Sequence, residues 1–169
     1  LPAASFLPAS GPRASGPRAS GSRRAAQALL AAAQILLPDL EQGTAIDARA
    51  LRAAMETSFD GTDADGVWDW KSAYDACEAA QILFLRKYGS AIARKAGSAV
   101  ATLAMIEKIS ALLPTHTRRS QGGQALQQFS TPAGLAFVAS VAASIHMGDT
   151  VLEPSAGTGL LALKSGDAA

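Results

Sequence analysis

The sequence VLEPSAGTGLL occupies residues 151–161 and contains the strongest fold signal in the chain. The run 150–153 predicts a short strand that ends at Glu153, and a glycine-containing loop then leads into the start of a helix. At Gly157 and Gly159 a side chain would forbid the turn or hold the backbone away from a ligand. The free N–H groups of the following helix suit a carboxylate, and Glu153 can accept hydrogen bonds from an ammonium group. These features together favour a cofactor that contains an amino acid.

Two other kinds of glycine loop are alternatives. A phosphate-binding P-loop needs a glycine directly before its Lys-Ser/Thr pair, but Leu163 precedes Lys164. Glu153 would also repel a phosphate-rich nucleotide. A dinucleotide-binding GxGxxG loop accepts a small residue at its third glycine, and Ala162 meets that requirement. The loop therefore argues against a nucleotide-binding ATPase fragment and leaves a dinucleotide ligand open.

The segment QFSTP, residues 128–132, precedes another predicted helix. Thr131 and Pro132 indicate an N-cap and a first helical position, and the apolar helix is expected to run to about Ile145. VLEPSAGTG resembles motif I of the DNA amino-methyltransferases, which binds S-adenosylmethionine (SAM), and QFSTP resembles their motif X. Motif X lies just upstream of motif I in the adenine-N6 subclass, so the pair is more specific than either motif alone.

The resemblance implies the start of an α/β doubly wound (Rossmann-like) class I methyltransferase fold. In that family the Ser-Thr-Pro segment and the glycine loop pack around the methionine end of SAM. Glu153 would engage the methionine amino group, either directly or through an ordered water. The implied function is SAM-dependent methylation of DNA at adenine N6. Carried over residue by residue, the implied cofactor-binding residues are Phe129, Ser130, Thr131, Pro132, Glu153, Pro154, Gly157 and Gly159.

The catalytic part of the family pattern has no match in these residues. The acidic residue that binds the ribose has no counterpart, because only ten residues follow Gly159. The catalytic Asn/Asp-Pro-Pro-aromatic motif is also absent, and base flipping and target recognition need further residues. We therefore expect an amino-terminal fragment of a methyltransferase, without catalytic residues, that methylates nothing by itself.

The rest of the chain has a mainly helical pattern. Small-residue repeats, including GPRAS twice, predict a disordered tail over residues 1–22. Apolar residues then recur at three- and four-residue spacing in four blocks: 23–37, 46–57, 69–88 and 98–113. The expected helix breaks are Pro38 with Asp39, residues 60–66, Gly89 with Ser90, and Pro114, and Ser98 is an expected N-cap. The predicted organisation is a helical domain at 23–114, a linker at 115–124 and the truncated methyltransferase start at 125–169.

A second resemblance covers about residues 25–161. DGVWDWKSAYDACEAAQILFLRKYG at 65–89 and ALLPTHTRRS at 111–120 resemble the amino-terminal part of bacterial and phage strawberry-notch-like proteins. In those large proteins a methylase-like region precedes a helicase-type ATPase. This resemblance implies two partners, DNA and a helicase-type region of the parent protein. A different class of function is the alternative: a non-enzymatic helical docking module of a larger helicase-type protein.

Composition adds several expectations. Four arginines carry all the charge before Asp39, which leaves 11 basic residues against 14 acidic ones in the remainder, so no general basic field indicates nucleic-acid binding. Cys77 is the only cysteine, which excludes an internal disulfide or a multi-thiolate zinc site and fits a reducing, cytoplasmic setting. No metal site and no membrane partner are expected. Cys77 and the aromatic residues of 68–88 are expected to pack in the core.

Overall fold

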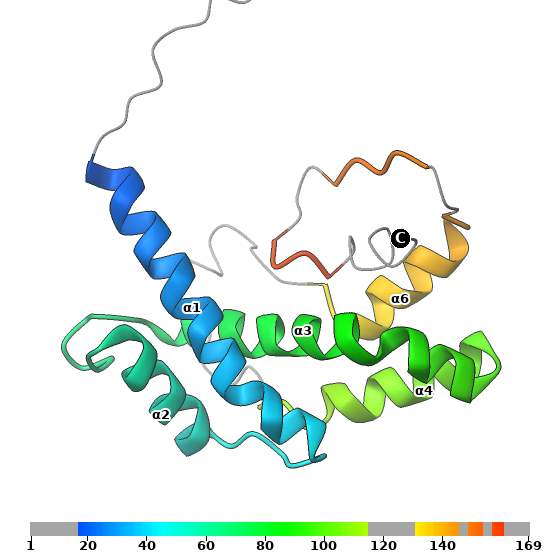
Figure 1. Cartoon of the computed structure of the whole chain (residues 1–169), viewed down its shortest axis with the longest axis horizontal. Coiled ribbons are helices and arrows are strands. Elements are labelled where there is room, and N and C mark those ends of the chain that lie inside the picture. The colour runs from blue at the N-terminus through cyan, green and yellow to red at the C-terminus, as the bar shows by residue number, and fades with distance from the viewer. Residues whose placement is uncertain (1–16, 115–130, 146–148, 154–156, 161–169) are drawn as a thin grey trace, which may run out of the picture.

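The computed structural model describes residues 17–114, 131–145, 149–153 and 157–160, with side chains described from residue 21 onward. These parts of the chain are mostly helical, as the sequence predicts, and they contain no strand. Figure 1 shows the helices in chain order: α1 (Pro17–Glu41), α2 (Ala48–Phe59), α3 (Trp70–Ala96), α4 (Ala99–Ser110) and α6 (Ala133–Ala142). No helix in the described ranges is both long enough and apolar enough to cross a membrane.

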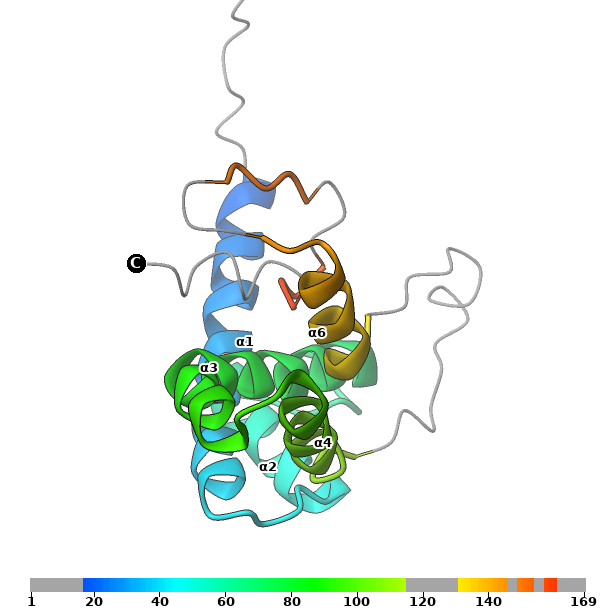
Figure 2. The same ribbon diagram turned by 90° about the vertical axis from the view of Figure 1, so that its right-hand side faces the viewer.

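The helices are arranged around α3, which at 27 residues is about 40 Å long. Helix α1 crosses α3 and makes the largest helix-helix contact in the described structure, and α2 packs mainly against α1. Helix α4 lies along the second half of α3, and α6 packs on α4. Figure 2 shows α4 and α6 one above the other, beside α3. The candidate cofactor segments therefore rest on the α3–α4 side of the helical part.

Side-chain caps fix where three of the helices begin. The carboxylate of Asp47 accepts a hydrogen bond from the backbone N–H of Ala50 at 2.7 Å and starts α2. Asp69 does the same for Ser72 at 2.8 Å and starts α3. Each cap satisfies a backbone donor that has no partner within the helix. The predicted N-cap at Ser98 is confirmed, because its hydroxyl accepts from the N–H of Ala101 at 3.2 Å.

The larger hydrophobic core lies between α1, α2 and the first half of α3. Buried side chains on α1 recur at helical spacing, with Leu36 and Leu40 facing the partner helices. The expected core packing is confirmed for Cys77 and for the aromatic side chains of Trp68 and Tyr74, which are all buried there. The aromatic residues at the start of α3 therefore stabilise the fold and do not form an exposed stacking surface for bases.

Helix α1 is longer at both ends than the sequence predicted. It begins at Pro17, inside the range expected to be a disordered tail, and it continues through Pro38 to Glu41. The expected break at Pro38 is wrong. Proline removes one helical hydrogen bond, at a cost of about 3 kcal/mol, but Pro38 is exposed and the residues on either side of it, Leu36 and Leu40, are buried in the core. Burial of both leucines keeps the helix continuous.

The expected break at Gly89 and Ser90 is also wrong, because α3 continues to Ala96. Glycine inside a helix costs only about 1 kcal/mol relative to alanine, which packing and a good terminus offset. The terminus is Gly97, whose φ of 70° is the left-handed conformation typical of helix C-caps, and Arg94 and Lys95 occupy the last turn. The glycine that ends the helix is therefore Gly97, eight residues beyond the expected break at Gly89.

The C-terminal segments differ from expectation in two further ways. Pro132, and not Thr131, is the N-cap of α6, and it forms no side-chain hydrogen bond with the helix, which ends at Ala142. Residues 150–153 form no strand. A strand is stabilised by hydrogen bonds to a neighbouring strand, and the described residues offer this segment no such neighbour. The Rossmann-like part of the expected fold therefore does not appear in the described residues.

A polar network holds the loop between α2 and α3. The guanidinium of Arg52 donates to both carboxylate oxygens of Asp63, at 2.8 and 3.2 Å, and lies 5.5 Å from the ring centroid of Trp70. The indole N–H of Trp70 also donates to Asp63, at 3.0 Å, and that of Trp68 donates to the carbonyl of Gly61 at 2.9 Å. Asp63 therefore holds the loop in two ways: it forms a bidentate ion pair with Arg52, and it accepts a hydrogen bond from the neutral indole of Trp70.

Replacing Asp63 tests the strength of this network. We expect Asp63→Ala to lower the free energy of unfolding by about 2 kcal/mol, because it removes the acceptor of three hydrogen bonds, two of them charge-assisted. Urea denaturation followed by tryptophan fluorescence measures the loss. The matched control is Asp75→Ala, which breaks only the exposed i,i+4 pair with Lys71 and should cost at most about 0.5 kcal/mol. Equal losses in the two variants would contradict the structural role of Asp63.

Candidate cofactor-binding site

The glycine loop has the backbone conformation that requires glycine. Gly157 has a φ of 53° and Gly159 a φ of 93°, both in the region that residues with a side chain rarely adopt. A Cβ atom added at Gly159 would meet nothing within 4 Å, so the backbone dihedral, and not crowding by the protein, requires glycine there. Alternating positive-φ residues turn successive N–H groups towards one side, which is a common way of binding an anion.

The hydroxyl of Thr158, between the two glycines, is bonded to the helical part. It donates a hydrogen bond to Oε2 of Glu78 at 3.0 Å, across 80 positions of sequence. Glu78 lies in the first half of α3 and is only 8% exposed, in a stretch whose neighbours are alanines and Cys77. A carboxylate buried to this extent is costly unless hydrogen bonds compensate it. The contact therefore stabilises both the loop and the buried charge.

Next to this polar contact, Leu160 packs in a second hydrophobic cluster. The buried members of the cluster come from four segments: Leu85 of α3, Ile106 of α4, Ala133 and Ala136 of α6, and Leu160 itself. The residue that follows the glycine loop and the first turn of α6 therefore share one apolar core. This cluster brings the residue after QFSTP, Ala133, close to the residue after VLEPSAGTG, Leu160.

Helix α6 packs on α4 through its first turn. Gly134 lies in this turn, where an added Cβ would meet the carboxylate end of Glu107, an exposed side chain that can rotate away, and would lie 3.3 Å from Leu103 Cδ1. The packing of the two helices places Thr131 and Pro132, just before α6, beside the helical part.

The structure describes five of the eight predicted cofactor-binding residues. Phe129, Ser130 and Pro154 lie outside the described residues. Thr131 and Glu153 are half-buried, whereas Pro132 is exposed. Glu153 takes part in a further interaction within the protein. The two glycine positions have the conformation that the loop prediction requires.

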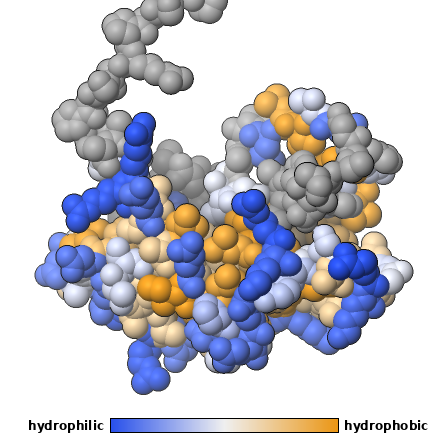
Figure 3. Space-filling view, in the orientation of Figure 1, coloured by the Kyte–Doolittle hydropathy of each residue, from blue (hydrophilic) through white to orange (hydrophobic). Residues whose placement is uncertain are grey.

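Apolar side chains remain exposed on the C-terminal segments. Leu135 is 62% exposed, and Val138 and Val141, which follow it at three-residue spacing, share its face of α6. Leu152 is 86% exposed, beside the exposed Val151. Figure 3 shows orange atoms on the upper right of the molecule, where Figure 1 places these segments. This face has the character of a surface that another element covers.

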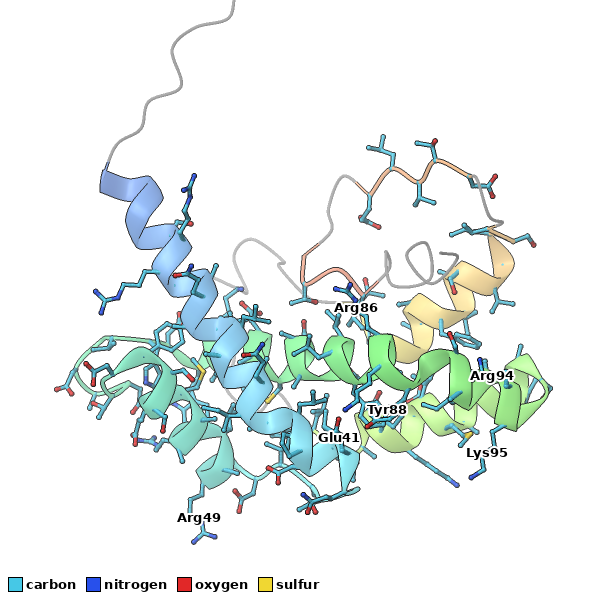
Figure 4. The ribbon with its side chains drawn as sticks, in the orientation of Figure 1. Glu41, Arg49, Arg86, Tyr88, Arg94 and Lys95 are labelled. Atoms are coloured by element: carbon cyan, nitrogen blue, oxygen red, sulfur yellow. The ribbon has the colours of Figure 1, made fainter. Side chains whose placement is uncertain are left out.

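A charged cluster joins α1 and α3 away from the glycine loop. Lys87 donates to the carboxylate of Glu41 at 2.8 Å, and the hydroxyl of Tyr88 donates to the same oxygen at 3.1 Å. Figure 4 shows Glu41 and Tyr88 pointing toward one another between the two helices. The hydrogen bond from Lys87 lowers the pKa of Glu41, and the same bond raises the pKa of Lys87. Because all three groups are at the surface, the cluster contributes little to stability.

The described residues contain no group of three or more His, Cys, Asp or Glu side chains that could hold a metal ion. Comparison of the chain with protein-family models, with curated proteins and with solved structures found no match.

Glu78 and Thr158 are the site residues that the sequence did not single out. One signal was present at each position. Glu78 is a lone acid in the run ACEAA on an otherwise apolar part of a helix, and Thr158 is the hydroxyl-bearing residue between two glycines. Neither signal predicts that Glu78 and Thr158 contact each other. The two residues are 80 positions apart, and only the packing of the C-terminal segment on α3 brings them together.

Proposed function

We propose that residues 125–169 begin the SAM-binding part of a DNA methyltransferase of the adenine-N6 type, in a parent protein that also carries a helicase-like region. The observation that carries the proposal is the combination of two positive-φ glycines at 157 and 159 with a preceding acidic residue, Glu153, in a sequence that resembles motif I. The glycines give a loop rich in accessible N–H groups, which suits the methionine carboxylate. Glu153 suits the methionine ammonium group.

The second cluster supports the pairing of the two motifs. Leu160 follows the loop, Ala133 follows the Ser-Thr-Pro segment, and both side chains are buried in the same cluster. In the methyltransferase interpretation the two segments line one end of SAM, so they must lie near one another. The apolar packing provides a physical reason for that proximity.

The exposed apolar residues also fit the proposal. In a doubly wound fold, the strand that ends at Glu153 would be a buried central strand, covered on both faces by helices. Val151 and Leu152 are strongly apolar for an exposed segment. Helices on the two faces of a parallel sheet would cover these side chains, and neighbouring strands would form backbone hydrogen bonds with the segment.

In this proposal the described residues bind and orient the cofactor. When bound, SAM supplies an activated methyl group, which is transferred to the target amine by in-line displacement at carbon. Such a reaction depends on positioning more than on acid-base chemistry. Glu153 and the glycine loop would hold the methionine end of SAM, Glu153 through the ammonium group and the loop through the carboxylate.

Titration with SAM, followed by backbone amide NMR, tests the proposal. We expect SAM to shift the amide signals of Thr131, Ala133, Gly134 and residues 157–160 and to leave those of α2 unchanged. Glu153→Gln should weaken the affinity about tenfold, because it removes the charge that attracts the ammonium group. The matched control is Asp149→Asn, an exposed carboxylate four residues upstream, which should change the affinity less than about twofold.

The alternative function, a non-enzymatic docking module of a larger helicase-type protein, is favoured by the exposed apolar face of α6. A pure docking module has no use for Glu153 or for the glycine loop. If SAM moves no amide in either segment of the folded chain, the cofactor assignment fails and the docking module becomes the better hypothesis. If NAD shifts the same amides and SAM does not, the loop belongs to a dinucleotide-binding protein.

A further inference from the structure

The glycine loop is attached to the helical part by contacts of two kinds. The polar contact is the hydrogen bond from the hydroxyl of Thr158 to Glu78. The apolar contact is the burial of Leu160 against Leu85 and Ile106. Thr158 and Leu160 are two residues apart, on either side of Gly159, so the two contacts hold the loop on both sides of its second positive-φ glycine.

Glu78 holds the acceptor oxygen of this hydrogen bond at a fixed position in α3. The carboxylate is nearly buried in α3, a helix held by packing against α1 and α4. Its acceptor oxygen therefore cannot follow the loop if the loop moves. Hydrogen bonds weaken steeply with distance and angle, so a fixed acceptor selects one position of the Thr158 hydroxyl. Because Thr158 lies between Gly157 and Gly159, that position also constrains both glycine dihedrals.

We infer that Glu78 is a positioning residue for the glycine loop, which it holds through Thr158 in the conformation that binds the cofactor. The cofactor part of this inference rests on the proposed function. The helical domain then contributes to the cofactor site indirectly, through the hydrogen bond between Glu78 and Thr158. Its packing determines whether the loop is pre-organised, and pre-organisation lowers the ordering cost of binding.

Three variants of the full chain test the inference. Thr158→Val keeps the volume and β-branching of the side chain and removes only the hydroxyl donor, and Thr158→Ser keeps the hydroxyl. Glu78→Gln keeps a side-chain oxygen as acceptor. The two Thr158 substitutions lie outside α3 and the larger core, so they act on the hydrogen bond and not on the helical fold. Glu78→Gln changes the acceptor of the same bond, at a residue that also takes part in a further interaction within the protein. Amide NMR of the chain without ligand and SAM titration are the two readouts.

We expect Thr158→Val to shift the amide signals of residues 157–160 and to speed their hydrogen exchange, while the signals of Leu51 and Tyr74 stay unchanged. SAM affinity should fall about tenfold, because one hydrogen bond to a charged acceptor is lost. Thr158→Ser should restore both readouts to within about twofold of the original chain, and Glu78→Gln should give an intermediate effect. Rescue by serine separates positioning by the hydroxyl from a general effect on packing.

Two results would overturn the inference. One is unchanged hydrogen exchange of the loop amides at Gly157, Gly159 and Leu160 in Thr158→Val, which would mean that Glu78 does not hold the loop. The other is a shifted loop with unchanged SAM affinity, which would mean that the held conformation is irrelevant to the cofactor. Failure of the proposed function gives a different pattern: SAM perturbs nothing even in the original chain, while Thr158→Val still changes the loop, so the anchoring by Glu78 stands without the cofactor.

Discussion

Leu51→Ala should lower the free energy of unfolding by about 3 kcal/mol, the usual range for a buried leucine being about 3 to 5. Leu51 lies in α2 and is fully buried, in the core that α2 shares with α1 and α3. Truncation loses the transfer free energy of the side chain and leaves a cavity that the three helices fill only in part. Urea denaturation followed by circular dichroism at 222 nm measures the loss.

Leu30→Ala is the matched control for this substitution. Leu30 is 45% exposed on α1, so the same chemical change should cost less than about 1 kcal/mol. If the two variants lost equal stability, the packing of α2 on α1 and α3 would be wrong.

The second large effect concerns the thiol of Cys77. Burial, and to a smaller extent the nearby charge of Glu78, raises its pKa from 9.0 to about 12. At pH 8 the reactive thiolate is therefore roughly a thousandfold scarcer in the folded chain than in the unfolded chain. We expect the rate of reaction with a disulfide reagent to fall by at least that factor on folding, as measured by stopped-flow absorbance with and without denaturant.

The pH dependence of Cys77 follows from the same shift. Because its pKa is higher in the folded chain, the unfolded chain loses this proton first as pH rises. The thiol's contribution to stability is therefore fully present below about pH 9 and is lost between pH 9 and about pH 12. Val100→Cys in a Cys77→Ala background is the control, since Val100 is 80% exposed and its replacement should react at the rate of a free thiol. Fast reaction of Cys77 in the folded chain would contradict its burial.

The helical part of the fold could be predicted from the sequence because its signals are local. The three- and four-residue spacing of apolar residues predicted four of the five described helices, and the hydroxyl of Ser98 predicted the start of α4. Local signals could not show that the helices continue through Pro38 and Gly89. Whether a helix continues past such a residue depends on what its neighbours bury, and the burial of Leu36 and Leu40 is a property of the assembled helices.

The candidate site was predicted less completely. Its glycines could be identified because a positive φ restricts the residue type, and both have that conformation. The bond between Thr158 and Glu78 could not, because it depends on how a later segment packs on α3. The strand at 150–153 was predicted from its apolar run alone, which specifies neither a neighbouring strand nor the backbone hydrogen bonds that stabilise one. The cofactor and the reaction remain predictions from the motifs.

The continuity of α3 has a consequence for cooperativity. Its first half belongs to the core shared with α1 and α2, and its second half contributes Leu85 to the cluster shared with α4, α6 and the segment after the glycine loop. Because the two clusters contact α3 at neighbouring turns, opening the helix at one cluster weakens the helical hydrogen bonds next to the other. We therefore expect the two clusters to unfold cooperatively, although they belong to different parts of the chain.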